Sequence, residues 1–270
     1  MYNAPMLSIF EKIGAWIKTY VGVLIEFIKL SSEIVYWVVL GPLRSRPINH
    51  VHIYEQMVFM GAKSIGIVFF VTFFTGVVLA MQSAYQLSKF GATIYVASLV
   101  SVSICRELGP VLTALVIAGR IGAAITAEIG SMKVSEQIEA LETMAINPVR
   151  YLMVPKLLSL LIMLPCLTVI GDYSGMSGGY VIGVFNLNIN PHLYLQTSMK
   201  FLDLKDIYTG LSKSFVFAAI IALVGCYQGI KTRGGAVGVG QATTRSVVVS
   251  FILIIVADCI LTGIYFFSNM

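Results

Sequence analysis

Five apolar stretches constrain the fold of this chain more than any other feature. Each approaches or exceeds the length of about 20 residues that an α-helix needs to cross a bilayer. Because a bilayer offers no water, the backbone inside it must satisfy its own hydrogen bonds, which favours helices. The composition agrees, since 57% of the 270 residues are hydrophobic and 11% are charged. The sequence therefore predicts an all-α polytopic membrane protein with spans at 64–86, 94 to about 127, 151–185, 207–230 and 246–267.

The N-terminal segment 6–40 is apolar but carries a polar stripe. Charged or small residues recur there at helical spacings, which places them on one narrow face. The stripe consists of Glu11, Lys18, Gly22, Glu26, Lys29 and Glu33. Such a helix suits the membrane interface, whereas a first span would bury five charges in lipid. We therefore divide a single domain, 1–270, into an interfacial helix (6–40), a Pro- and Arg-containing cytoplasmic elbow (41–63) and a five-span core (64–268).

The segment 128–150, between spans two and three, changes character from apolar to amphipathic. We expect a short helix at 134–146 with an acidic face and an apolar face, closed by Asn147-Pro148. The acidic face carries Glu136, Glu139 and Glu142, and the apolar face carries Val134, Ile138, Leu141 and Ala145. Two interpretations stay open: a solvated loop helix, or a coupling helix that docks into a moving partner.

Two glycine patterns call for different interpretations. Gly171, Gly175, Gly179 and Gly183 repeat every four residues in span three and predict close helix packing along one face. The run "KTRGGAVGVGQATTR" at 231–245 resembles a phosphate-binding loop but lacks the Lys and Ser or Thr that should follow its last Gly. We expect a flexible cytoplasmic turn there, and no nucleotide-binding motif in the chain.

The distribution of Lys and Arg predicts the orientation. Ten basic residues gather on one side against three on the other, which places the elbow, 128–150 and the Gly-rich segment in the cytoplasm and the C-terminus outside. The ten are Arg44, Arg46, Lys63, Arg120, Lys133, Arg150, Lys156, Lys231, Arg233 and Arg245, and the three are Lys89, Lys200 and Lys205. The net charge of +5 is thus explained by topology rather than by a nucleic-acid partner. The four Cys have no metal-ligand spacing, so no metal site is expected.

Among the charges inside the predicted spans, four are candidate site residues: Arg106, Glu107, Lys213 and Asp258. Charges at such depth are costly and usually face a bundle interior or a cavity on a transport pathway. We expect Glu107 to pair with Lys213 or with a base on a second subunit, and Arg106 to meet a lipid phosphate or Asp258. The alternative is a structural ion-pair cluster that locks the helices. Pro110 predicts a local helix irregularity beside these charges.

A possible lipid-facing surface lies near the outer end of span one. Leu79, Leu87 and Phe90 have spacings of 8 and 3, which place them on one helical face that could line a cavity for acyl chains. Ordinary lipid contact or helix packing is the alternative, and Val77 is expected on another face.

One long stretch resembles the signature of the MlaE (YrbE) family of ABC-transporter permeases. It runs from Arg106 to Lys156, "RELGPVLTALVIAGRIGAAITAEIGSMKVSEQIEALETMAINPVRYLMVPK". The resemblance continues at "KSFVFA" from Lys213, "ATTRSVV" from Ala242 and "DCILTG" from Asp258. It implies a homodimer in the bacterial inner membrane. It also implies partner ATPase subunits that bind the ATP and magnesium, a periplasmic MCE-domain protein and, in many systems, a STAS-domain protein.

The same resemblance implies a substrate and assigns roles. Such permeases move phospholipid or related lipid between the inner membrane and the outer envelope, which bears on outer-membrane lipid asymmetry. Lipid occupies a cavity at the dimer interface near the charges that match Arg106, Glu107, Lys213 and Asp258, and the helix matching 134–146 docks on the ATPase. The chain itself would then have no catalytic residues. Direction of transport and headgroup preference do not follow.

Two other classes of function remain possible from the residues alone. An ion-coupled secondary transporter could relay protons through Glu107 and Asp258, but such carriers often contain two repeated halves, and no repeat is visible. A non-transporting envelope scaffold would suit the glycine packing but not the buried charges.

Overall fold

The computed structural model describes residues 4–40 and 50–268, and this part of the chain is helical with short connections and no strand. The first helices are α1 (Ala4–Leu40), α2 (His50–Met60), η2 (Ala62–Ser64) and α3 (Ile65–Ser88). The second span is built from η3 (Thr93–Tyr95), α4 (Val96–Ser103), η4 (Ile104–Leu108), α5 (Gly109–Ile117), η5 (Ala118–Gly122) and α6 (Ala123–Val134). The remaining helices are α7 (Gln137–Thr143), η6 (Val149–Met153), α8 (Val154–Phe185), α9 (Pro191–Phe201), α10 (Leu204–Ile230) and α11 (Gly235–Ser268).

Five helical segments of the described chain are long and apolar enough to cross a membrane, as the sequence predicts. They cover Val51–Ser88, Thr93–Val134, Val149–Phe185, Leu204–Ile230 and Gly235–Phe267. Each is at least as long as the predicted stretch, because the helices continue past the apolar residues into polar sequence. The predicted elbow is consequently helical from residue 50 onward, and its residues 41–49 lie outside the described part.

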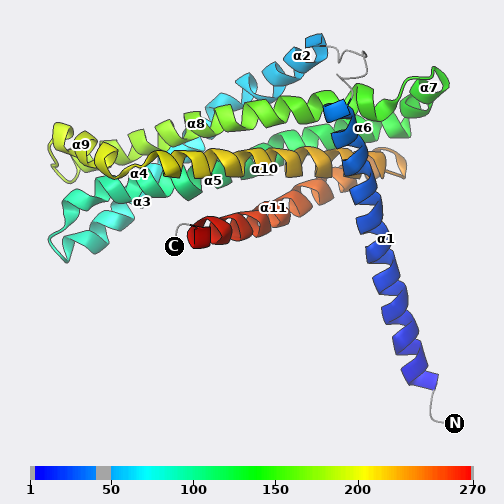
Figure 1. Ribbon diagram of the computed structural model, residues 1–270, viewed down its shortest axis with the longest axis horizontal. Helices are drawn as coiled ribbons and strands as arrows, with labels where there is room; N and C mark the ends of the chain where they lie inside the picture. Colours follow the sequence, from blue (N-terminus) through cyan, green and yellow to red (C-terminus); the bar gives the residue numbers. More distant parts are fainter. Residues whose placement is uncertain (1–3, 41–49, 269–270) are drawn as a thin grey trace.

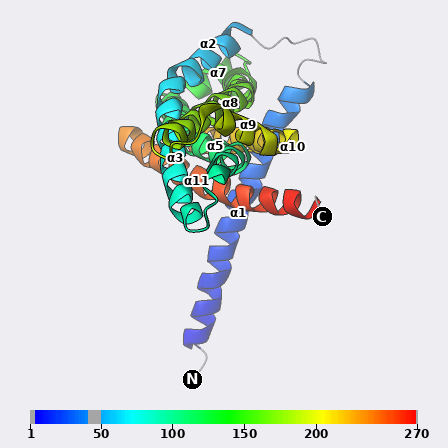
Figure 2. The same cartoon turned by 90° about the vertical axis from the view of Figure 1, so that its left-hand side faces the viewer.

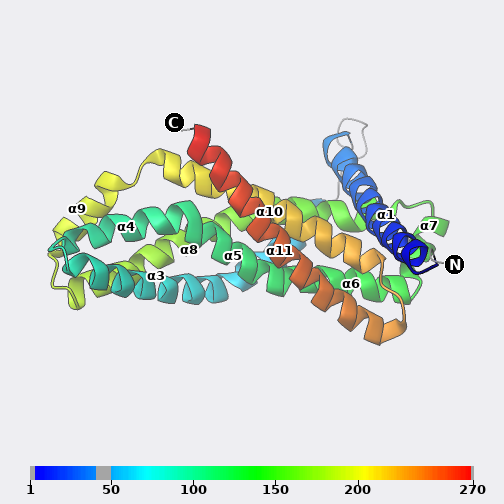
Figure 3. The same ribbon diagram turned by 90° about the horizontal axis from the view of Figure 1, so that it is seen from below.

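The five segments run side by side along the long axis of the molecule (Figure 1). One end carries α7, between α6 and α8, and the opposite end carries α9 and the connection between α3 and α4. The C-terminal end of α11 is directed towards the end that carries α9, and α11 crosses the bundle obliquely (Figure 3). An odd number of spans thus separates α7 from the C-terminal end of the chain.

Helix α1 lies across the axes of the spans at the end that carries α7 (Figures 1 and 2). A helix perpendicular to the spans runs parallel to the membrane plane, as expected for an interfacial helix. Its polar stripe meets the bundle where Glu26 pairs with Lys231, and Asn147 donates to Glu33 at 3.4 Å. The Lys231 hydrogen bond lowers the pKa of Glu26. The side chain of Glu11 lies outside the described residues.

Helices α3 and α8 form the closest helix pair in the core. A side chain at Gly76 would come within 1.9 Å of the Gly175 carbonyl oxygen, and one at Gly178 would come within 2.2 Å of the Phe73 carbonyl oxygen. The predicted stripe does not face one partner helix: Gly171 contacts Thr72 and Thr113, Gly179 contacts Val100, and Gly183 contacts Tyr194. Gly178, outside the four-residue repeat, makes one of the two backbone crossings. Helix α8 is surrounded on several sides, so small residues are needed on more than one face.

Three predicted loops or helices differ in the structure. The Gly-rich segment is not a flexible turn, because α11 begins at Gly235. The connection shortens to residues 231–234, and Gly234 and Gly235 have positive φ of 89° and 70°. The helix of the fifth span continues through these glycines although no residue from Gly235 to Arg245 is buried. The cooperativity of a long helix offsets their low helix propensity. The predicted helix 134–146 shortens to Gln137–Thr143, since Glu136 and Ala145 adopt positive φ. The polar segment 186–206 contains α9, whose N-cap Asn190 accepts a hydrogen bond from the His192 backbone.

Candidate functional site

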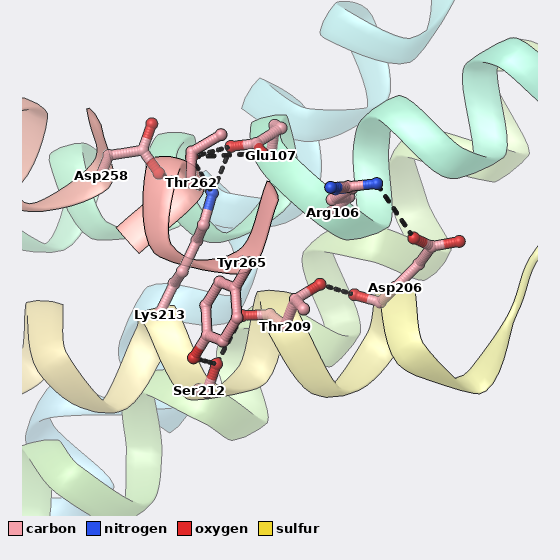
Figure 4. A network of polar contacts seen from close by, with 9 residues as sticks. All are labelled: Arg106, Glu107, Asp206, Thr209, Ser212, Lys213, Asp258, Thr262 and Tyr265. Carbon is pink, nitrogen blue, oxygen red and sulfur yellow. Dashed lines mark hydrogen bonds and ion pairs between the residues drawn. The ribbon is translucent and has the colours of Figure 1, made fainter. Parts of the chain in front are cut away.

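A π-helical segment positions the first two intramembrane charges. Pro110 lacks a backbone N–H, and the preceding residues Ile104–Leu108 widen into the π-helix η4, which confirms the predicted irregularity. Glu107 is thereby directed towards α10 and α11, whereas its neighbour Arg106 is directed towards the N-terminal turn of α10 (Figure 4). Adjacent residues on one helix thus serve two different partners.

Lys213 is the centre of the candidate site. Its side chain is 1% exposed, and its ammonium group contacts Glu107 of η4 and both Asp258 and Thr262 of α11 (Figure 4). Nζ donates to Glu107 Oε2 and, at 2.7 Å, to Thr262 Oγ1. Asp258 Oδ1 lies 2.9 Å from Nζ but outside hydrogen-bonding geometry. The expected pair of Glu107 and Lys213 forms within one chain, and Asp258 joins it.

Thr262 connects the two sides of this cluster. It accepts from Lys213 and its hydroxyl lies 3.3 Å from both carboxylate oxygens of Glu107. One turn away, Ser212 and Tyr265 share a hydrogen bond of 2.6 Å between α10 and α11. We refer to Glu107, Lys213, Asp258 and Thr262 as the Lys213 cluster.

The partner of Arg106 is Asp206 rather than Asp258. Arg106 Nη1 lies 3.8 Å from Asp206 Oδ1, and Asp258 instead faces Lys213. The expected pairing of Arg106 with Asp258 is therefore wrong in this structure. Asp206 was not predicted as a site residue because it falls in the polar segment before the fourth span. There it completes a capping box with Asp203 at the start of α10. The first turn of α10 thus reaches the depth of Arg106.

The charges of this region do not balance. Two cations, Arg106 and Lys213, face three carboxylates, Glu107, Asp206 and Asp258. Lys213 is enclosed, but the side chains of Glu107 and Arg106 are about one third exposed, at 33% and 32%. The site therefore has a buried structural centre and an accessible charged rim. Such a rim can exchange its internal partners for the charges of a polar ligand.

The segment around α7 forms a second candidate site at the opposite end of the molecule. Ile138 is buried and Leu141 is partly buried, whereas Glu136 and Glu142 are exposed. Glu139 pairs with Lys133 of α6, and this hydrogen bond lowers the pKa of Glu139. The apolar side of α7 thus faces the bundle and its acidic side faces solvent.

The three residues of the predicted acyl-chain surface do not share one environment. Leu79 and Leu87 pack against the small outer core formed by Ala80, Ala84, Val96 and neighbouring residues. Phe90 follows the last residue of α3, Ser88, and is 82% exposed, so helical spacing does not place it on their face. Val77, expected on another face, packs against the same core. Val77 therefore does not serve as a reference on another face against which lipid contact at Leu79 could be compared.

Three charged positions inside helices were not predicted as site residues. Lys156 is 2% exposed and pairs with Glu128 at 2.5 Å, although it was assigned to the cytoplasmic side. Arg120, assigned likewise, lies in η5 and donates to Ser64. Asp172 is buried in α8 and approaches Gly109. A Lys or Asp within a long apolar run was the available signal at Lys156 and Asp172.

This fold and site define a polytopic α-helical membrane protein with a charged cluster between its spans, the architecture of a transport subunit. The profile of the family described as Permease MlaE matches residues 53–264, and the chain belongs to this family of ABC transporter permeases. A probable ABC transporter permease protein of Rickettsia typhi is 45% identical over 214 residues, covering 79% of this chain and 83% of the relative.

Two further relatives extend this similarity beyond one genus. A probable ABC transporter permease protein of Synechocystis is 42% identical over 219 residues, covering 81% of this chain and 83% of the relative. The Arabidopsis thaliana protein named TRIGALACTOSYLDIACYLGLYCEROL 1, chloroplastic, is 33% identical over 212 residues, covering 78% of this chain and 61% of the relative. Family membership favours an ABC permease over the secondary transporter and the scaffold.

Proposed function

We propose that this permease moves phospholipid or a related lipid between the inner membrane and the outer envelope, powered by partner ATPase subunits. The observation that carries the proposal is the accessible rim of the charged region, where Arg106 and Glu107 are exposed beside an enclosed Lys213. A lipid has a charged or polar headgroup and apolar chains, and this combination fits a charged rim between lipid-facing helices. The name of the Arabidopsis relative contains that of a glycolipid, which supports a lipid substrate.

The proposed assembly follows the family resemblance. Two copies of this chain form a homodimer in the bacterial inner membrane, with ATPase subunits on the cytoplasmic side and an MCE-domain protein on the periplasmic side. A STAS-domain protein binds the ATPase in this arrangement. The N-terminus and α7 are cytoplasmic and the C-terminus is periplasmic, consistent with the excess of Lys and Arg near α7. Phospholipid is the substrate, and ATP with magnesium is bound by the ATPase.

Reconstitution with the partner proteins tests the function. In vesicles, a fluorescent phospholipid should be transferred only when ATP is supplied. Arg106→Gln should lower both the amount of phospholipid that co-purifies and the transfer rate, by about tenfold, because it removes a planar donor suited to phosphate oxygens. Arg106 is part-exposed, so the variant should still fold. The matched control is Arg233→Gln, an exposed arginine on the connection before α11.

The two readouts separate transport from structure. ATP-independent transfer, or none with an assembled complex, would contradict the proposed function. If Arg106→Gln keeps its co-purifying lipid while assembly of the complex fails, Arg106 is a structural residue.

The acidic side of α7 is proposed to contact the ATPase. Reversing both exposed charges, Glu136→Lys with Glu142→Lys, should weaken ATPase binding about tenfold, because it replaces two carboxylates at the interface with cations. The spans should fold normally, since neither side chain faces the bundle. Binding is measured by co-purification of the ATPase, and transport by the vesicle assay.

The control for the double variant is Glu55→Lys, a charge reversal at an exposed position of α2. Glu139 is left unchanged because its reversal would also break the pair with Lys133. Unchanged ATPase binding and transport in the double variant would leave α7 as a solvated loop helix.

A further inference from the structure

A groove between three spans, separate from the Lys213 cluster, contains one arginine. Its volume is about 470 Å³, and it is lined by Ile67, Leu115, Val116, Gly119, Arg120 and Phe251 from three spans. Apart from Arg120 and the backbone at Gly119, the lining consists of apolar side chains. The groove stays open at Gly119, where the nearest atom to an added Cβ would be the Phe251 ring at 3.9 Å.

Arg120 has no acidic partner among the described residues. Its guanidinium donates to the Ser64 hydroxyl, which in turn donates to the Met60 carbonyl oxygen at 2.6 Å. A guanidinium has five N–H donors, so most of its hydrogen-bonding capacity remains for a ligand. A cation in a membrane-spanning helix without an internal counter-charge is costly and marks a functional site by default.

The contact with Ser64 fixes the depth of Arg120. Ser64 directly precedes α3, next to the exposed Lys63, and the residues of α3 after it carry no charge. Arg120 is 14 positions from Arg106, or about 20 Å along the helix, towards the end that carries α7. We therefore place the guanidinium near headgroup level in the leaflet opposite the charged site of Arg106 and Lys213.

The apolar lining lies deeper in the membrane than Arg120. Ile67 follows Ser64 along α3, and Leu115 and Val116 precede Arg120 by about one turn, both in the direction of the bilayer centre. The groove thus has a cationic end at headgroup level and an apolar floor leading inward. This is the shape and polarity of a phospholipid with an anionic headgroup.

We propose that this groove binds an anionic phospholipid of the leaflet on the α7 side, with the phosphate on Arg120 and an acyl chain along Ile67, Val116 and Phe251. A second copy of this chain is a poorer occupant, because a symmetric contact through the groove would bury two uncompensated guanidinium groups. Free phosphate would use the arginine but not the apolar floor. The site does not require that the protein transports lipid.

A tryptophan in the groove tests the proposal with the full chain. In a background with Trp16→Phe and Trp37→Phe, the substitution Phe251→Trp places one fluorophore on the groove floor. The protein is reconstituted in phosphatidylcholine, and quenching by brominated phosphatidylglycerol is compared with quenching by brominated phosphatidylcholine. We expect a relative binding constant of about 10 in favour of phosphatidylglycerol, as one charge-assisted hydrogen bond would give.

Charge and position controls complete the design. Arg120→Gln should reduce the ratio to about 1, whereas Ser64→Ala, which keeps the guanidinium, should leave a clear preference. The position control is Ile252→Trp, at an adjacent exposed residue of α11 that does not line the groove, where both lipids should quench equally. Inorganic phosphate should not relieve the quenching at Phe251→Trp, because it cannot occupy the apolar floor.

Each remaining result overturns the proposal. Equal quenching by the two lipids at Phe251→Trp, with Arg120 present, would mean bulk lipid contact. Absence of quenching by either lipid would mean that a protein surface, such as a second copy, covers the groove. These readouts need no ATPase. The groove proposal can therefore fail while lipid transport is confirmed, and lipid transport can fail while the groove proposal is confirmed.

Discussion

Lys213→Met is expected to destabilise the protein more than any other single side-chain removal among the intramembrane charges. The substitution keeps the length of the side chain but leaves Glu107 and Asp258 facing each other without a cation. Removing one partner of a buried ion pair typically costs about 3–5 kcal/mol. Because both carboxylates are partly exposed, we expect the lower end, about 3 kcal/mol. Thermal unfolding in detergent and ATP-driven lipid transfer measure the loss.

The matched control is Lys200→Met, which removes a lysine of α9 that has no acidic partner among the described residues. It should unfold at the temperature of the unmodified protein. An unchanged unfolding temperature for Lys213→Met would show that water or ions compensate the two carboxylates, and the Lys213 cluster would then not be a structural centre.

A charge swap distinguishes a simple pair from the cluster. For an isolated pair, Glu107→Lys with Lys213→Glu should restore most of the stability. In this structure the new carboxylate at position 213 would face Asp258, so we expect only partial recovery. Adding Asp258→Asn should then recover a further part, because the like charge is removed. Full recovery by the double swap alone would show that Asp258 does not interact with position 213.

Gly76→Ala is expected to have the second large effect. The added Cβ would lie 1.9 Å from the Gly175 carbonyl oxygen and 3.0 Å from the Gly175 Cα, so the backbones of α3 and α8 must separate. Overpacking typically costs about 1–3 kcal/mol, and we expect the upper end because a helix backbone, not a flexible side chain, has to move. A lower unfolding temperature in detergent and faster proteolysis of the purified protein report this loss.

Gly66→Ala is the control on the same helix. No atom lies within 4 Å of an added Cβ at Gly66, and alanine has the higher helix propensity, so stability should stay the same or rise by up to about 1 kcal/mol. If Gly76→Ala were as stable as Gly66→Ala, the α3–α8 crossing would be looser than the structure shows.

The sequence was informative wherever one helix decides the outcome. Apolar length alone predicted the number of spans, since a bilayer selects helices of sufficient length whatever their neighbours are. The cost of charge in lipid identified Arg106, Glu107, Lys213 and Asp258 as one group of interest, and the missing N–H of Pro110 predicted the irregular turn beside them. These arguments need no knowledge of which helix packs on which.

Tertiary structure decided every question about partners. The packing of α10 and α11 placed Asp258 beside Lys213, and Arg106 forms an ion pair with Asp206 instead. The α3–α8 crossing falls on Gly76 and Gly178 as well as on the predicted stripe, because crossing points depend on the angle between helices and not on the period of one. Likewise, Arg120 could be recognised as a cation with no acidic partner in the described part of the chain only when the surrounding spans were in place. Periodicity fixes which face a residue occupies, but the energy of a buried charge depends on the group across from it, and that group comes from a distant part of the chain.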